Sequence, residues 1–208
     1  MYEYVTKSES RKFRQVCSDI LTKTRDNLRN NYDIISQFTL VGSGARNLIT
    51  RDGNGPFDLD YNLEIIKAPD AVLKDPKELK ETVRKCLNNV VRTTSFSDSK
   101  DSTSVLTCIL NLDNRLDELF SFDVAIVTRN NSGKNLRLIH NKTVSLSGRQ
   151  GQFTWNEIAD SGDLLIKAKK IKERGQWIQV RNRYLELKNM YLKKRTTIIR
   201  LLLFTWKP

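Results

Sequence analysis

Residues 57–65 read Phe-Asp-Leu-Asp-Tyr-Asn-Leu-Glu-Ile, an uninterrupted alternation of apolar and polar side chains. Successive side chains of a β-strand point to opposite faces, so this pattern predicts a strand with one apolar and one polar face. Asp58 and Asp60 then project together from the polar face. Two adjacent carboxylates repel each other unless a cation lies between them, and their hard oxygen atoms suit Mg²⁺ or Mn²⁺. The alternative is a solvated strand face, which Asn62 and Glu64 would extend.

The segment before this strand predicts a phosphate-binding turn. Residues 34–41 are typical of a strand, and they run directly into Gly42-Ser43-Gly44. Residues 45–49 then predict the first turns of a helix. Glycine lets the backbone approach a ligand closely, and the free N–H groups and dipole at a helix N-terminus favour an anion. A tight turn without a ligand is the alternative interpretation.

A third carboxylate lies further along the chain. Residues 104–112 and 119–127 predict two strands joined by a polar turn, and Asp123 is the only charged residue in the second strand. An ionised carboxylate in so apolar a strand needs a partner, because uncompensated burial costs several kcal/mol. A metal ion shared with Asp58 and Asp60 is one such partner, and a salt bridge to Arg or Lys is the structural alternative.

In this order, the Gly-Ser turn, the Asp-x-Asp strand and the later lone Asp resemble the signature of the nucleotidyltransferase superfamily typified by DNA polymerase beta. The resemblance covers about residues 34–127. It implies an α+β fold with a small mixed β-sheet and flanking helices, and an enzyme that moves an NMP from an NTP to an acceptor hydroxyl with release of pyrophosphate. One departure is the stretch of 14 residues between Ser43 and Asp58, which contains residues 51–56 and predicts a flexible insertion.

The resemblance also implies a metal site. Asp58, Asp60 and Asp123 would be the catalytic residues and the ligands of two Mg²⁺ or Mn²⁺ ions. Asp58 and Asp60 would hold both ions. Asp123 would bind the catalytic ion and help to take the proton from the acceptor hydroxyl. Three carboxylates provide enough negative charge to bind the ions while leaving coordination positions open for substrate oxygens.

The nucleotide site follows from the same resemblance. Gly42 and Ser43 would hold the triphosphate, and Arg46 would lie beside it at the start of the helix. Relatives often use a lysine on the helix after the catalytic sheet, which makes Lys167 and Lys170 candidates by their position in the chain. No sequence motif supports these two lysines.

The positive charge of the chain is concentrated near its C-terminus. The net charge is +12, and residues 164–208 hold 13 basic and 2 acidic side chains. A helix from near Trp155 to Gly175 and a second over residues 176–194 are predicted here, the second with apolar contacts from Ile178, Leu185 and Tyr184 or Met190.

These basic helices would attract triphosphate and, beyond it, an RNA acceptor. A solvated basic face is the alternative. The division expected is a catalytic α/β domain over residues 1–150 and a basic helical segment over residues 151–208.

Two further helices are predicted to pack on the sheet. The first covers residues 8–30, and the second covers residues 76–95 with Asp75 as N-cap and Pro76 at the first position. The apolar face of the first helix consists of Phe13, Val16, Cys17, Ile20, Leu21 and Leu28.

Composition restricts the functional class. No apolar stretch is long enough to span a membrane, and the N-terminus lacks a signal-peptide core, which predicts a cytoplasmic protein. Cys17, Cys86 and Cys108 are widely spaced and predict buried reduced thiols. A single histidine, His140, argues against Ser-His or Cys-His hydrolysis and against a histidine-rich zinc site.

Two questions stay open at this stage. One is whether the fold catalyses transfer or is a non-catalytic nucleotide- or RNA-binding protein that uses its basic helices. The other is the acceptor: an RNA or tRNA end, a small molecule, a protein side chain and a second nucleotide all satisfy the chemistry.

Overall fold

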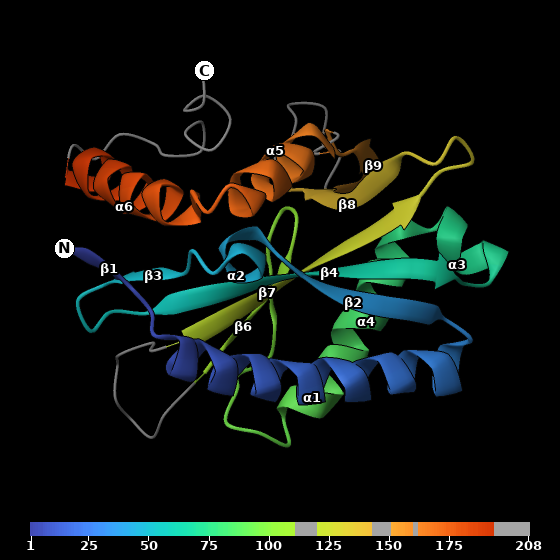
Figure 1. The fold of residues 1–208 in the computed structure, drawn as a ribbon. Helices are drawn as coiled ribbons and strands as arrows, with labels where there is room; N and C mark the ends of the chain where they lie inside the picture. Colours follow the sequence, from blue (N-terminus) through green and yellow to red (C-terminus); the bar gives the residue numbers. More distant parts are fainter. Residues whose placement is uncertain (111–119, 143–150, 160–161, 194–208) are drawn as a thin grey trace.

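The computed structural model describes residues 1–110, 120–142, 151–159 and 162–193 (Figure 1). In this part of the chain, strands form a mixed sheet in the order β2-β4-β7-β6-β5, with β8 beside β7 and β9 beside β8. The strands are β2 (Ile35–Val41), β4 (Phe57–Lys67), β5 (Lys100–Asp101), β6 (Leu106–Ile109), β7 (Phe120–Arg129), β8 (Asn135–Asn141) and β9 (Gln152–Glu157). β4 and β7 pair in parallel and the other pairings are antiparallel. The predicted α+β class is therefore confirmed.

Helices cover both faces of the sheet (Figure 1). On one face lie α1 (Lys7–Tyr32) and α4 (Pro76–Val91), and over the other lie α5 (Gly162–Glu173) and α6 (Trp177–Lys193). The short helices are α2 (Gly42–Arg46) and α3 (Asp70–Lys74). A separate two-stranded ribbon pairs β1 (Tyr2–Tyr4) with β3 (Thr50–Asp52).

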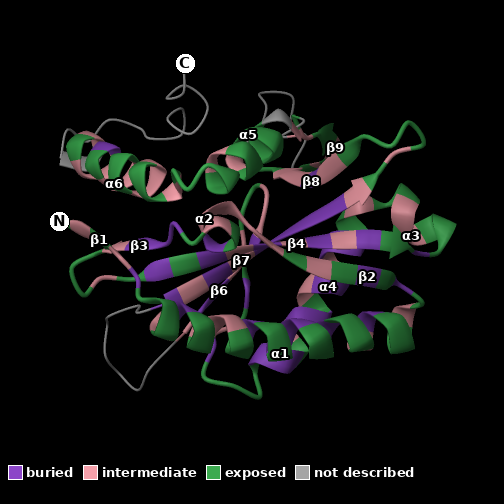
Figure 2. Cartoon of the chain, in the orientation of Figure 1, coloured by how far each residue is buried: buried purple, intermediate pink, exposed green. Residues whose placement is uncertain are grey.

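The core lies between the sheet and the layer formed by α1 and α4. The predicted alternation of β4 is confirmed, since Leu59 and Leu63 are fully buried while Asp58 is exposed (Figure 2). Phe13 of α1 stacks on Phe120 of β7 with ring centroids 4.3 Å apart. The apolar side of β4 and β7 thus faces α1 and α4, and their polar side faces the α5 and α6 layer.

Local sequence signals explain where the packed helices begin. The side chain of Asp75 accepts hydrogen bonds from the N–H groups of Lys77 and Glu78, and Pro76 occupies the first turn of α4. These contacts satisfy donors that a helix start leaves free, as the capping pattern predicted. The apolar face of α1 was predicted with one error: Val16 is 42% exposed, because it lies beside the buried stripe.

The prediction of a helix starting near Trp155 is wrong. Residues 152–157 form β9, which pairs antiparallel with β8. Phe153 and Trp155 alternate with polar residues along it and pack against the core, a period of two that suits a strand. The first C-terminal helix begins instead at Gly162.

Two other expectations near the site need correction. The stretch before Asp58 is not simply a flexible insertion, since residues 50–52 form β3 and pair with β1. In α6, Ile178 and Met190 are 57% and 43% exposed, and among the side chains described in this helix, over residues 177–191, Leu187 is the buried one. The domain division near residue 150 stays a prediction.

Other predictions concern thiols and membranes. Cys17, Cys86 and Cys108 are buried and free, as predicted. Among the described residues, none of the helices combines the length and the apolar character needed to cross a bilayer.

Candidate active site

The three predicted carboxylates lie on one face of two adjacent parallel strands. Asp60 of β4 is in register with Asp123 of β7, and Asp58 is in register with Ser121. Residues in register on neighbouring strands point to the same side of a sheet. This side is opposite the apolar core, so the carboxylates face the layer that contains α5 and α6 (Figure 1).

Burial and mutual repulsion both act on these carboxylates. The pKa of Asp60 is raised to about 6, mainly by burial and then by the charges of Asp58 and Asp123, while Arg137 opposes the shift. Burial also raises the pKa of Asp123, against a hydrogen bond of 2.5 Å that Thr107 Oγ1 donates to Asp123 Oδ1. Among the described residues, no Lys or Arg forms an ion pair with any of the three carboxylates. The salt-bridge alternative for Asp123 therefore has no support in this part of the chain.

The donors on this face fit a divalent cation in kind. Asp58, Asp60 and Asp123 offer hard carboxylate oxygens, and Asn62 Oδ1 on the same face of β4 is buried without a hydrogen-bond partner. Within the described ranges, however, no three His, Cys, Asp or Glu side chains are close enough together to form a ready-made metal site. A cation would have to draw the carboxylates together, and its charge would offset the repulsion that contributes to the raised pKa values of Asp60 and Asp123.

The Gly-Ser turn lies directly against the carboxylates. Val41, the last residue of β2, is in register with Asp60, and the chain then turns into α2. Gly42 has a φ of +62°, and a Cβ atom there would collide with Asp60 Oδ2. Glycine suits this position, because a side chain would be strained in the left-handed backbone and would have to displace the Asp60 carboxylate. The predicted helix is a single turn that ends at Arg46, whose side chain is half-buried.

Helix α6 contributes two residues that the sequence analysis missed. Tyr184 and Lys188 lie one helical turn apart, and the charge of Asp58 acts on both. Burial lowers the pKa of Lys188, which the nearby Asp58 opposes. Lys188 Nζ donates a hydrogen bond of 2.5 Å to Thr50 Oγ1 of β3. The i, i+4 spacing of Tyr184 and Lys188 on the predicted helix is visible in the sequence. The sequence does not indicate which face of this helix meets the sheet.

A second cation comes from β8. Arg137 faces Asp60 closely enough to lower its pKa, and Arg137 Nε is buried without a hydrogen-bond partner. An unpaired guanidinium donor beside the carboxylates is suited to a phosphate oxygen. Lys167 and Lys170 are exposed on α5, so their predicted contact with the nucleotide stays a prediction.

A surface hollow of about 450 Å³ lies elsewhere, along α4 and beside the last residue of α1. Its walls include Tyr32, Arg84 and Asn88, and it contains none of the predicted site residues. Most of its lining comes from α4, which lies on the opposite side of the sheet from α5 and α6 (Figure 1).

Comparison with solved structures identifies the fold. The structure matches the apo form of DncV from Vibrio cholerae with a TM-score of 0.56 and 10% sequence identity, over 82% of this chain and 57% of that chain. It matches the 3'-deoxy ATP-bound form of the same protein with a TM-score of 0.53 and 9% identity, over 79% and 55% of the two chains. DncV is described as a cyclic AMP-GMP synthase. The chain has the nucleotidyltransferase fold.

The assignment of the fold rests on structural similarity and not on sequence similarity. No protein-family model matches the sequence, and no curated protein matches it in a sequence comparison. The chain spans little more than half the length of the DncV structures that it resembles. The nucleotidyltransferase fold thus agrees with the resemblance seen in the sequence, while the chemistry must be argued from the residues.

Proposed function

We propose that the chain is a metal-dependent nucleotidyltransferase, which moves an NMP from an NTP to an acceptor hydroxyl and releases pyrophosphate. One observation carries this proposal: three carboxylates of β4 and β7 share a face, and Gly42 lies against one of them, Asp60. The similarity in fold to DncV supports it.

Asp58, Asp60 and Asp123 would hold two Mg²⁺ or Mn²⁺ ions. When bound, such ions make an attacking hydroxyl more acidic and stabilise negative charge on the α-phosphate and the departing pyrophosphate. Asp60 lies against the Gly42 turn, where the triphosphate would bind.

Asp123 would serve as the proton acceptor. Thr107 occupies Oδ1 of this carboxylate, which leaves Oδ2 for the acceptor hydroxyl. The hydroxyl oxygen would form a bond to the α-phosphorus, its proton would pass to Asp123, and the bond between the α-phosphorus and the bridging oxygen would break. The pKa of Asp123 is raised by burial, which makes it a stronger base than an exposed aspartate.

The phosphates would meet backbone N–H groups and cations. Gly42 and Ser43 would cradle the triphosphate, with Lys188 and Arg137 on either side of the carboxylate face. Arg46, Lys167 and Lys170 would add positive charge at the edge of the nucleotide site.

A charge-removing substitution tests Lys188. Lys188→Gln should raise the Kd for Mg²⁺-NTP roughly ten- to a hundredfold, because a charge-assisted hydrogen bond contributes about 1.5–3 kcal/mol. Titration calorimetry across a salt series measures this, with Lys167→Gln/Lys170→Gln as a parallel variant that should also weaken binding and flatten its salt dependence. An unchanged Kd in either variant would remove those lysines from the site.

The acceptor we propose is the hydroxyl of a second nucleotide. A DncV structure of this fold was solved in complex with the linear intermediate pppA(3',5')pG, in which one nucleotide has been joined to another. An RNA or tRNA end and a small molecule are the competing acceptors, and the basic α5 and α6 helices would favour RNA.

Labelling distinguishes these acceptors. The protein would be incubated with each α-³²P-labelled NTP and Mg²⁺ or Mn²⁺, with a second unlabelled NTP or with total cellular RNA. Label in a dinucleotide, with one pyrophosphate per transfer, is the expected result. Label in RNA would identify RNA as the acceptor. Metal-dependent NTP binding without pyrophosphate release would show that the protein is a non-catalytic nucleotide-binding protein.

A further inference from the structure

The N-terminal strand and α6 are 173 or more positions apart in sequence and are joined by a dense set of contacts. The side-chain amide of Asn189 bonds both backbone groups of Tyr2: the N–H of Tyr2 donates to Oδ1 at 2.7 Å, and Nδ2 donates to the carbonyl oxygen at 3.1 Å. In this way Asn189 replaces the backbone of a neighbouring strand at the open side of β1.

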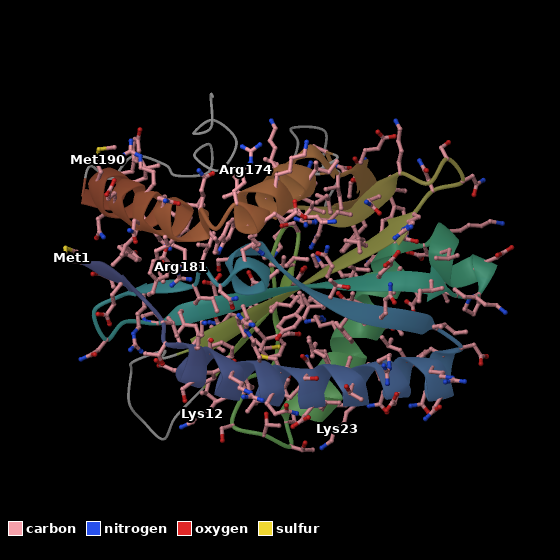
Figure 3. All side chains as sticks on the ribbon, viewed as in Figure 1. Met1, Lys12, Lys23, Arg174, Arg181 and Met190 are labelled. Atoms are coloured by element: carbon pink, nitrogen blue, oxygen red, sulfur yellow. The ribbon has the colours of Figure 1, made fainter. Side chains whose placement is uncertain are left out.

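A second residue of β1, Tyr4, contacts α6 nearer the start of that helix. Its hydroxyl donates a hydrogen bond of 2.5 Å to the carbonyl oxygen of Arg181, and its ring lies 3.9 Å from the Arg181 guanidinium carbon. Arg181, labelled in Figure 3, in turn donates to the carbonyl oxygen of Asn47 at the end of α2. Arg181 therefore connects α6 to the end of α2, the short helix that contains Gly42 and Ser43, and Tyr4 of β1 contacts this arginine.

Lys188 lies between these two attachments. Its Nζ is 4.8 Å from the centre of the Tyr2 ring and bonds Thr50 on β3, the partner strand of β1. Contacts with both β1 and β3 thus restrict the position of the Lys188 side chain. The charge of Asp58 also acts on Lys188.

We infer that β1 is a clamp that positions α6 over the carboxylate face, with Asn189 and Tyr4 as the positioning residues that hold Lys188 where it can meet the NTP phosphates. This inference rests on the proposed function for its catalytic consequence. Its structural part, that β1 sets the position of Lys188, stands independently of any transfer activity. Neither Asn189 nor Tyr4 would touch substrate.

Asn189→Asp tests the clamp with almost no change in size. The aspartate loses the donor to the Tyr2 carbonyl and places a negative charge against that oxygen. Asn182→Asp is the matched control, because Asn182 is exposed on the same helix. Tyr4→Phe is a second variant that removes the bond to the Arg181 carbonyl and keeps the ring beneath the guanidinium.

Two measurements do not depend on activity. Hydrogen exchange of α6 amides and acetylation of Lys188 by an amine-reactive reagent, both followed by mass spectrometry, should be several-fold faster in Asn189→Asp and Tyr4→Phe than in the wild type and in Asn182→Asp. Unchanged exchange and labelling in both clamp variants would overturn the inference.

Steady-state kinetics tests whether the clamp affects the use of NTP at the carboxylate site. Pyrophosphate release by Asn189→Asp should show a KM for NTP raised about tenfold with a smaller change in kcat, while Asn182→Asp resembles the wild type. Faster exchange with an unchanged KM would overturn the positioning role. If the wild type neither binds nor turns over any NTP, the proposed function fails, and exchange and labelling still decide whether β1 holds α6.

Discussion

Asp60 combines the three features that make a residue informative here: partial burial, two carboxylate neighbours and direct contact with a glycine turn. Its pKa, raised to about 6, shows that the folded protein tolerates an unfavourable charge at this point. Such a charge is costly unless a ligand offsets it, which is why perturbed carboxylates in a cluster indicate a functional site.

Neutralising Asp60 should lower activity strongly without lowering the stability of the fold. Asp60→Asn is expected to lower pyrophosphate release about a thousandfold, since it removes a metal ligand contributing about 4 kcal/mol to the transition state. The metal-free variant should unfold at the same temperature as the wild type or a higher one, because like-charge repulsion is lost. Glu64→Gln, a control further along β4, should keep its activity. A clearly lower melting temperature for Asp60→Asn would mean that this carboxylate is structural.

Gly42 can be tested by adding one methyl group. Gly42→Ala should destabilise the protein by more than the roughly 1–2 kcal/mol cost of a left-handed alanine, because its Cβ also collides with Asp60. Gly53→Ala is the matched control, with a φ of +53° and open space around its Cβ. Urea denaturation measures the loss of stability in each variant, and the difference between the two losses is the cost of the collision with Asp60. Equal losses of stability would show that Gly42 is required only for the turn.

At the scale of elements, α4 is connected to the sheet edge by a buried polar cluster. Asp101 of β5 lies between Lys80 of α4 and His140 of β8, at 2.5 Å from the nitrogen of each. Lys80 also donates to the Ser102 carbonyl at 2.8 Å, and Lys142 faces the same carboxylate. Asp101 of β5 therefore joins α4 to β8, and His140 extends the contacts to β9 by stacking on Phe153.

This cluster predicts a pH-dependent contribution to stability. Burial would raise the pKa of Asp101, but the hydrogen bonds from Lys80 and His140 outweigh it and lower the pKa. A carboxylate with a lowered pKa in the folded state stabilises the fold above its unfolded pKa, about 3.9, and loses that contribution as the pH falls through the folded value. Asp101→Asn should therefore cost about 3–5 kcal/mol at pH 7, since Lys80 is left buried and unpaired.

The measurement is urea denaturation of wild type and Asp101→Asn from pH 8 to pH 3. The difference in free energy of unfolding should be constant above about pH 5 and shrink below pH 4. Asp98→Asn, which breaks an exposed pair with Arg92, should have a much smaller effect. A difference that does not change with pH would contradict the predicted ionisation of Asp101.

At the scale of the whole molecule, the sheet separates two environments. Its lower face packs on α1 and α4 to form the core, and its upper face lies under a layer of α5 and α6 that is mainly exposed or half-buried (Figure 2). The layer of α5 and α6 carries many basic side chains, and Lys188 of α6 is near enough to Asp58 for the two charges to interact. Positive charge on this side of the sheet would favour the approach of an anion.

Substrate binding should raise the stability of the whole domain. NTP with Mg²⁺ at about 100 times its Kd should stabilise the folded state by about 2.7 kcal/mol. For a chain of this size, that corresponds to a rise in melting temperature of roughly 5–10 °C. Thermal denaturation with each NTP, with and without Mg²⁺, measures the effect, and EDTA should reverse it. No metal-dependent rise with any NTP would contradict nucleotide binding.

Local patterns predicted the elements that carry the carboxylates. The alternation over residues 57–65 was sufficient to place Asp58 and Asp60 on one strand face, and the Asp75-Pro76 pair was sufficient to start α4. The apolar character around Asp123 likewise identified the strand in which it lies. These signals are short-range, because strand periodicity and helix capping depend on residues within a few positions of one another.

The sequence by itself therefore determined the faces of the strands that carry the carboxylates and the start of α4, but not the start of α5. Only the tertiary structure decided that Lys188 and Arg137 accompany the carboxylates and that β1 meets α6. The physical reason is distance along the chain: Lys188 bonds a residue 138 positions away, and Asn189 bonds one 187 positions away. Such pairings depend on how the layers pack, and no local periodicity encodes them.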